Sequence, residues 1–496
     1  MPAGEAVTDE RTLLAGTGAN VIGLAAGVVA AFGVQLLLGR SLPNGGLALV
    51  TVAVQFAFVA AAGARFGMDL ASVRAVAIGA GTSRMSHLRS LVDRCAGIAL
   101  VAGIVLGAVV AALSPLAGDR AEGIAIGAAA LPLIATANVY LGATRGLKKM
   151  GPTLWVFWIG QPVAWIGLAA IAILLGGETN AAIAAYDLSW LGGLVAAWLM
   201  WRRMAEWPDA RPATRAEVSA VLRYGAPRAP SALLAQALFW GDLFVLAHFA
   251  SGRSLDAYAA AARISQLILL FLTSVNLVFS PFAADLHSRG ERERLDALFK
   301  RATRWALAAT LPLAIVLFVA APQALEAFGP GYATGSTPLR IMLVGQTVNV
   351  ATGGVAFVLV MAGFTGLDLA DNILAAAVLF ALAIPLAAAE GPTGAAAASA
   401  VALAAVNLVR LAQVHRRIGI QPFDGAYGRL VLPAAGCAAA AWAARAVTDA
   451  HPWWVVAAAT SIAGAIAYAV LLPAGLPAAE RASVASFTRR ISNRPR

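Results

Sequence analysis

The chain has 496 residues, of which 60% are hydrophobic and only 12% are charged, with a formal net charge of +11. Soluble domains contain roughly 45–50% apolar and about 25% charged residues, so this composition excludes a soluble protein. The basic excess would suit a nucleic-acid-binding protein, but its placement along the chain decides that question.

Fourteen apolar segments are long enough to cross a bilayer as helices of about 20 residues. They are residues 13–38, 45–64, 96–116, 122–143, 154–175, 181–201, 229–250, 258–284, 305–321, 341–364, 372–389, 393–411, 430–447 and 453–472. The acidic start of the chain lacks the basic region and cleavage site of a signal peptide, so we expect it to be retained. The fold class predicted is therefore an all-α polytopic membrane protein.

Most Lys and Arg residues lie on one side of the membrane when both termini are placed in the cytoplasm. The loops predicted to be external hold only Arg40, Arg120, Arg253, Arg340 and Arg445. This asymmetry follows the positive-inside rule and predicts a plasma-membrane or inner-membrane protein with both termini cytoplasmic. Because the basic excess suits anionic lipid headgroups, membrane lipids are expected partners and nucleic acid is not.

One loop predicted to be cytoplasmic, residues 363–371, is acidic instead of basic. It carries Asp368 and Asp371 at DxxD spacing. Without a catalytic domain or a second acidic motif, we interpret this segment as a solvated loop.

The short external loops leave no room for the catalytic domain of a membrane glycosyltransferase or protease. The two cysteines, Cys95 and Cys437, lie in apolar stretches and form no CxxC pair. The sequence also lacks a phosphate-binding loop, an HExxH motif and a nucleophile elbow. We therefore expect no enzyme, no cofactor and no metal site.

The spacing of the segments indicates an internal repeat. Segments one to six and seven to twelve begin at positions separated by about 207 to 219 residues, and in each half a long basic connection follows the second segment. An even number of spans makes the repeat parallel. The domains predicted are a six-helix lobe at 1–201, a cytoplasmic linker at 202–228, a second lobe at 229–411, two further helices at 412–477 and a basic tail at 478–496. Two such lobes favour a transporter with a cavity between them over a scaffold or receptor.

Two charged residues lie inside predicted spans, where a charge costs at least ~2.5–3.5 kcal/mol. Asp242 and Arg263 flank an external turn predicted at 251–257, so we expect them at similar depth and able to pair. One interpretation is that the pair only locks two helices together. The other is that Arg263 offers its guanidinium to a phosphate, while Asp242 holds or releases it.

Other polar side chains inside the spans are candidates for a substrate-binding cavity. Gln266 and Asn276 share a broad polar stripe with Arg263 at 100° per residue. The remaining candidates are Asn20, Gln55, Gln346 and Asn349. For each of these alone, hydrogen bonding between helices is the competing role.

Residues 258–349, with the stretch YAAAARISQLILLFLTSVNLVFSPFAADL and the later AFGPGYATGSTPLRIMLVGQTVN, carry a family resemblance. Residues 391–420 add to this resemblance, because they combine a helix rich in small residues with a basic segment after it. The chain resembles the oligosaccharide flippase, or polysaccharide transporter, family of the multidrug/oligosaccharidyl-lipid/polysaccharide exporter superfamily. The resemblance implies alternating access by two rocking lobes, with spans 1, 2, 7 and 8 lining the cavity. It also implies cavity arginines for a lipid diphosphate, of which Arg263 is the clear match.

The function predicted is a flippase that moves polyprenyl-diphosphate-linked oligosaccharide from the inner to the outer leaflet for cell-surface polysaccharide assembly. The expected partners are this lipid-linked substrate, a coupling cation, and a polysaccharide polymerase or glycosyltransferases. A cation-coupled multidrug antiporter of the same superfamily is the alternative, since an acid such as Asp242 would suit it. A polytopic glycosyltransferase is a third, less favoured reading.

Overall fold

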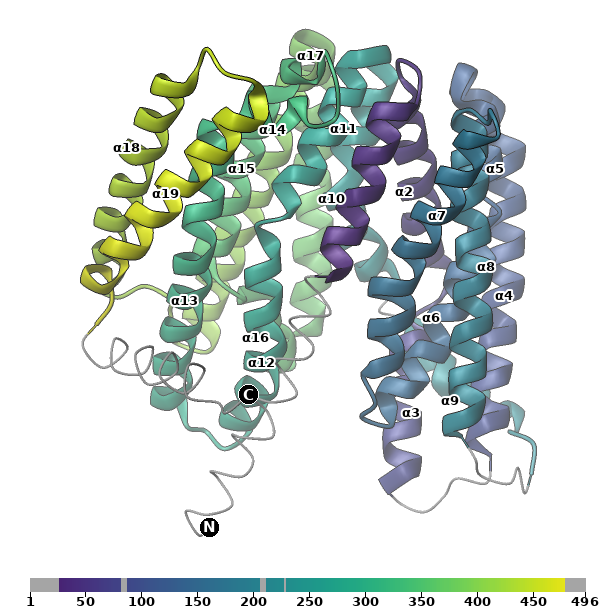
Figure 1. The fold of residues 1–496 in the computed structure, drawn as a ribbon. Coiled ribbons are helices and arrows are strands. Elements are labelled where there is room, and N and C mark those ends of the chain that lie inside the picture. Colours follow the sequence, from purple (N-terminus) through teal and green to yellow (C-terminus); the bar gives the residue numbers. More distant parts are fainter. Residues whose placement is uncertain (1–25, 82–86, 206–210, 227–228, 478–496) are drawn as a thin grey trace, which may run out of the picture. The chain divides into compact units, whose positions relative to one another are not determined.

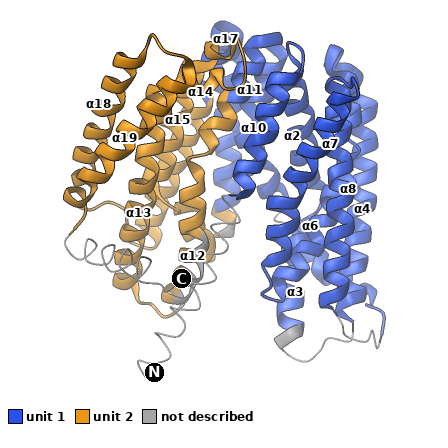
Figure 2. Ribbon diagram, viewed as in Figure 1, with its two compact units in different colours: residues 1–260, 368–398 blue, residues 261–367, 399–496 orange. Residues whose placement is uncertain are grey.

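The computed structural model describes residues 26–81, 87–205, 211–226 and 229–477. These residues contain helices and no strand (Figure 1), which confirms the all-α membrane fold. They divide into two compact units, residues 1–260 with 368–398, and residues 261–367 with 399–496 (Figure 2). The predicted lobe boundaries describe a sequence repeat and stay a prediction.

Unit 1 holds the first helices of the chain and the start of the second half. Its elements are a helix at Ala26–Ser41, α2 (Gly46–Ala64), α3 (Met68–Gly81), α4 (Leu88–Leu113), the 3-10 helix Ser114–Arg120, α5 (Ala121–Gly127), α6 (Ala130–Gly146), the π-helix Thr153–Gly160, α7 (Gln161–Leu174), α8 (Thr179–Met204), α9 (Arg215–Gly225), α10 (Ala229–Phe249), residues 252–260 of α11 (Gly252–Gln266) and residues 368–398 of α17 (Thr365–Arg417). The basic connection predicted after the second segment thus contains α3, and the linker predicted at 202–228 contains α9.

Unit 2 holds the rest of the described chain. Its elements are the end of α11 (Gly252–Gln266), α12 (Leu269–Ser288), α13 (Arg292–Val319), α14 (Ala321–Glu326), α15 (Ser336–Thr352), α16 (Val355–Met361), the later part of α17 (Thr365–Arg417), α18 (Val431–Thr448) and α19 (Trp453–Gly475).

Each of the fourteen predicted spans contains helix in the part that the structure describes. By length and composition, the described residues contain 10 candidate spans, or up to 11 if the bent pair α15–α16 counts as one. The count is lower than fourteen for three reasons. The first predicted span is described only from Ala26 onward, the fourth is broken between α5 and α6, and α17 contains two predicted spans. Within α17 the helical conformation is interrupted at Gly391, with φ 56° and ψ −130°. Glycine adopts this conformation readily, and the following Pro392 cannot donate the backbone bond that would continue the helix.

Close helix packing in unit 1 depends on glycines. A Cβ at Gly103 of α4 would lie 2.5 Å from Pro132 Cα on α6, and one at Gly142 would lie 2.3 Å from the Asp69 carbonyl oxygen. Small residues allow this approach where the hydrophobic effect no longer drives helices together. The abundance of glycine in the sequence therefore has a packing role.

Two predicted loops are helical in the structure. The turn expected at 251–257 is instead the beginning of α11, which starts at Gly252. The solvated loop expected at 363–371 is also wrong, because α17 starts at Thr365 and Asp371 is only 2% exposed. Both errors have one cause: the first turns of these helices are polar, and hydropathy alone cannot distinguish a polar helical turn from a loop.

The last two helices are anchored on α13 within unit 2. Tyr468 of α19 donates its hydroxyl hydrogen to the Ala308 carbonyl at 2.7 Å. Arg445 of α18 donates to the Val319 carbonyl, at the end of α13, at 2.6 Å. These bonds, together with the packing of α18 against α19, make the pair an integral part of unit 2.

Candidate functional site

Asp242 is a buried carboxylate near the middle of the α10–α11 hairpin in unit 1. It is 4% exposed, and it accepts hydrogen bonds from the Tyr258 hydroxyl at 2.7 Å and from the Leu243 amide at 2.8 Å. Tyr258 itself has no exposed surface. Hydrogen bonds to a charged acceptor are among the stronger ones in proteins, so this pair fixes α10 against α11.

Tyr258 was missed by the sequence reasoning, because the turn predicted at 251–257 placed the start of α11 too late. With α10 ending at Phe249 and α11 beginning at Gly252, Asp242 and Tyr258 lie at nearly equal distances from the turn. Arg263 lies five residues further along α11, more than one helical turn deeper. The predicted pairing of Asp242 with Arg263 is not tested by this geometry and stays a prediction.

A second buried carboxylate holds the tip of the same hairpin. Asp256 of α11 has no exposed surface and accepts from the amides of Gly45 at 2.7 Å and Ala48 at 2.8 Å. These amides belong to the N-terminus of α2, which has unsatisfied N–H groups and favours negative charge. Arg120 adds a bond to the Ala250 carbonyl at 2.8 Å. The end of unit 1 that is predicted to be external is therefore closed by specific bonds.

α2 runs along α10 below this tip. Gln55 of α2 is 7% exposed, and its neighbour Phe56 makes an edge-to-face contact with Phe244, with ring centroids 5.7 Å apart. Asn20, the other candidate from the first two spans, lies outside the described residues. α2 and α10 are thus packed against each other, and whether they line a cavity stays a prediction.

The remaining candidates lie in unit 2. Arg263 and Gln266 are half-buried in the last turn of α11, just before the chain breaks and resumes as α12. Asn276 is 5% exposed and packs on the break between α15 and α16, where a Cβ at Gly354 would lie 2.3 Å from its Oδ1. Since α15 and α16 bend by 40° at that break, Asn276 lies against a bent stretch of backbone.

Gln346 and Asn349 belong to a row of amides that joins α15 to α17. The Asn349 side chain donates to Gln346 Oε1 at 3.2 Å, and Asn407 donates to Asn349 Oδ1 at 2.9 Å. Asn407 was not among the predicted site residues, although it lies in the motif at 391–420 that carries the family resemblance. These amides have partners within the protein, which favours hydrogen bonding between helices as one of their roles.

The acidic segment at the start of α17 joins α10 in unit 1. The Ser231 hydroxyl donates to Asp368 at 2.6 Å and accepts from the Asn372 side chain at 2.9 Å. Asn372 and Asp371 are both nearly fully buried. Asp368 is therefore part of a helix–helix contact and Asp371 is buried, although both were interpreted as solvated. Sequence reasoning missed the contact because Ser231 is remote along the chain.

Over the described residues, no group of three or more His, Cys, Asp or Glu side chains is arranged to hold a metal ion. The arrangement instead offers buried carboxylates that accept hydrogen bonds from a hydroxyl and from backbone amides, with Arg253 3.5 Å from Asp256. It also offers a row of amides and a half-buried guanidinium. Such groups can bind polar substrates or protons inside a membrane bundle.

Comparison with known proteins gives the family. The family model described as polysaccharide biosynthesis protein matches residues 13–287, which is more than half of the chain, and the MatE model matches residues 227–382. No sequence among the curated proteins matched.

Solved structures with a similar fold include a lipid II flippase and multidrug transporters. The lipid II flippase MurJ in an inward closed conformation is 15% identical with a TM-score of 0.72, covering 92% of this chain and 98% of that one. An inward-facing MATE family multidrug transporter is 16% identical with a TM-score of 0.63, covering 79% of this chain and 94% of that one. A mutant of the Vibrio cholerae MATE transporter VcmN is 15% identical with a TM-score of 0.61, covering 83% and 99%. The chain is thus a multi-pass membrane protein that belongs to the polysaccharide biosynthesis protein family, within the multidrug/oligosaccharidyl-lipid/polysaccharide exporter superfamily.

Proposed function

We propose that this protein is a flippase for polyprenyl-diphosphate-linked oligosaccharide, which it moves from the inner to the outer leaflet for cell-surface polysaccharide assembly. The observation that carries the proposal is the extent of the similarity to the lipid II flippase, 92% of this chain compared with 79–83% for the MATE transporters. The two C-terminal helices α18 and α19, which lie outside the twelve-span repeat, also support similarity to the flippase, because it covers more of this chain than the MATE transporters do.

The physical task of such a flippase suits these residues. A polyprenyl tail can remain in lipid while the polar headgroup crosses through a groove whose polar side chains replace the water molecules that hydrate the headgroup. Arg263 is the residue proposed to bind the diphosphate, because a guanidinium offers several N–H donors in a planar fork. The neutral polar groups Gln266, Gln55 and Gln346 would contact sugars, and no chemical step is required of the protein.

This proposal includes a location and partners. The protein would lie in the plasma membrane or inner membrane with both termini cytoplasmic, as the positive-inside rule favours. Its partners would be the lipid-linked substrate, a coupling cation, and the polymerase or glycosyltransferases that act before and after it.

The second candidate is a cation-coupled multidrug antiporter. It is supported by the buried Asp242 carboxylate, whose neutral hydroxyl donor Tyr258 could serve the protonated and the ionised form alike. In that case Asp242→Asn would abolish coupling, and Arg263→Gln would have little effect on drug efflux.

Deletion of the gene tests the proposal. Lipid-linked glycans should accumulate on the cytoplasmic leaflet, where an impermeant sugar-modifying reagent added outside cannot reach them. Wild-type protein should restore exposure and Arg263→Gln should not, whereas Arg203→Gln, an exposed cytoplasmic-end control, should. Normal surface polysaccharide together with new sensitivity to cationic drugs would reject the flippase and favour the antiporter.

A further inference from the structure

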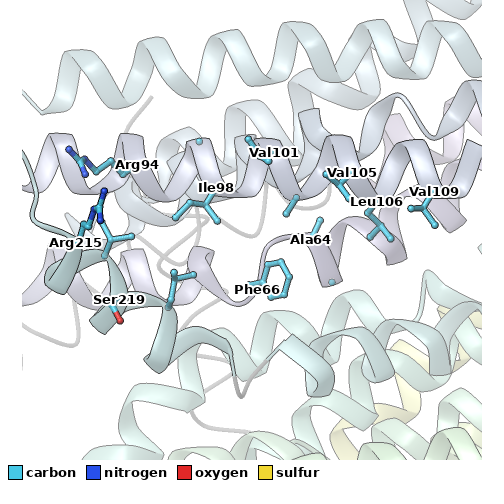
Figure 3. A pocket seen from close by; sticks show the side chains of 15 residues that line it. Ala64, Phe66, Arg94, Ile98, Val101, Val105, Leu106, Val109, Arg215 and Ser219 are labelled. Carbon is cyan, nitrogen blue, oxygen red and sulfur yellow. The ribbon is translucent and has the colours of Figure 1, made fainter.

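A cavity of about 990 Å³ lies in unit 1, bordered by the end of α2, by α4 and by α9 (Figure 3). One wall is apolar and comes from successive turns of α4. Arg94 and Arg215 lie together at one end of the cavity, and Ile98, Val101 and Val109 follow in order away from them. None of these residues belongs to the site described above.

The apolar wall faces outward instead of into the protein. Val101 is 62% exposed, Val105 is 59% and Val109 is 46%, and all three lie in a candidate membrane span. At ~1.5 Å per residue, the wall from Arg94 to Val109 extends about 22 Å. This length exceeds the roughly 15 Å depth of one leaflet of a bilayer, so the wall can follow a whole lipid chain.

The two arginines are available to a ligand. Both are exposed, and in the described part of the chain no side chain forms an ion pair with either of them. They occupy the end of the cavity next to α9, which the positive-inside rule places at the cytoplasmic surface. Paired guanidinium groups at that depth suit a phosphate.

α9 is held in place independently of any ligand. Thr214 and Glu217 form a capping box at its start, and the preceding Ala213 amide donates to the Ser90 hydroxyl of α4 at 3.0 Å. At its end, a Cβ on Gly67 would lie 2.2 Å from the Gly225 carbonyl oxygen. The cavity is therefore preformed, with Val218 and Leu222 of α9 completing its lining.

We propose that this groove binds one anionic phospholipid of the cytoplasmic leaflet. Its phosphate lies between Arg94 and Arg215, and one acyl chain lies along Ile98, Val101 and Val105 of α4. A lipid-linked oligosaccharide fits less well, because Ser219 is the only uncharged polar side chain in the lining and a sugar headgroup needs several hydrogen-bonding partners. The site is thus separate from transport and retains a structural lipid.

Native mass spectrometry of the detergent-purified full chain tests the charged end. The wild type should retain added phosphatidylglycerol at least ten times better than phosphatidylcholine. The double variant Arg94→Gln/Arg215→Gln should lose this preference. The matched control Arg203→Gln/Arg223→Gln removes the same charge from exposed positions outside the cavity and should keep it. Equal lipid retention by both double variants would overturn the proposal.

A second pair of variants tests the apolar wall. A Cβ at Gly97 or at Gly192 meets no other atom within 4 Å, so both positions accept a side chain, but only Gly97 lines the cavity. Gly97→Trp should reduce the retention of phosphatidylglycerol at least tenfold, and Gly192→Trp should leave it unchanged. The proposal fails if Gly97→Trp retains the lipid, or if Arg94→Gln/Arg215→Gln abolishes binding of a polyprenyl diphosphate instead of phosphatidylglycerol.

Discussion

The two ends of α2 differ in how their polar surroundings are satisfied. At its N-terminus, the Gly45 and Ala48 amides bind the Asp256 carboxylate, which is fully buried. At its other end, α2 borders the groove in which Arg94 and Arg215 are exposed above an apolar wall. At the first end the amides have their acceptor within the protein, and the contact closes that end of unit 1. At the second end we propose that the two arginines bind a lipid phosphate.

The closed end can be broken at Asp256. Asp256→Ala leaves the buried Ala48 amide and the partly buried Gly45 amide without their acceptor. The loss of an acceptor costs about 1–3 kcal/mol for a buried group. We expect the largest effect of the single changes considered, a loss of about 2–5 kcal/mol in unfolding free energy, measured by thermal unfolding in detergent. Asp256→Asn keeps one carbonyl acceptor and should lose less. If the alanine variant is as stable as the wild type, the closure does not depend on this carboxylate.

The Asp242–Tyr258 hydrogen bond lies in the same hairpin, further from its tip than Asp256, and can be broken in the same way. Tyr258→Phe removes the hydroxyl while preserving the ring, and a hydrogen bond to a charged group contributes about 1.5–3 kcal/mol. A stability loss in that range is expected, again from thermal unfolding, and Asp242→Asn should lose less because its amide oxygen still accepts. An unchanged Tyr258→Phe protein would mean that the hydroxyl contributes nothing to the hairpin.

The amide row in unit 2 should be less sensitive than either carboxylate. Asn407→Leu removes the donor to Asn349 and to the Leu403 carbonyl, and a neutral hydrogen bond contributes only about 0.5–1.5 kcal/mol. We therefore expect a loss of about 1–2 kcal/mol. A loss greater than that of Asp256→Ala would reverse the ranking of neutral and charged contacts.

The packing of α9, which borders the groove, should weaken in acid. Hydrogen bonds from Arg211 lower the pKa of Glu217 from 4.5 to about 2, with smaller contributions from Thr214 and His87. Because the folded-state pKa is depressed, ionised Glu217 stabilises docked α9 above about pH 4.5, and this stabilisation is lost as the pH falls towards 2. Hydrogen exchange of the α9 amides should accelerate over that range. Glu217→Gln should exchange faster at neutral pH and show a weaker acid dependence; identical profiles would exclude Glu217 as the cause.

The fold was largely predictable because membrane helices have a simple requirement. A span must be apolar and satisfy its own backbone, so hydropathy located helix in every predicted segment that the structure describes. The first turns of α11 and α17 were misread because Asp256 and Asp371 are polar, and their burial depends on partners elsewhere in the fold. A single sequence does not reveal such partners.

The candidate site was only partly accessible to the same reasoning. Asp242 stood out because a charge within a span is rare, but its partner Tyr258 is an ordinary aromatic residue. Asn407 and Ser231 are likewise inconspicuous until the helices are packed together. Sequence identifies the polar residue that is out of place, whereas the neutral residue that satisfies it needs the structure.

The most direct test of the flippase proposal is transfer of a fluorescent polyprenyl-diphosphate oligosaccharide in proteoliposomes, followed by quenching from outside. The wild type should make labelled lipid in the inner leaflet accessible to the quencher, and Arg263→Gln should reduce the rate at least tenfold. Arg223→Gln, an exposed change in α9, should leave the rate unchanged. Transfer that proceeds equally in Arg263→Gln and in the wild type would contradict the role of this arginine, and no transfer by the wild type would contradict the flippase itself.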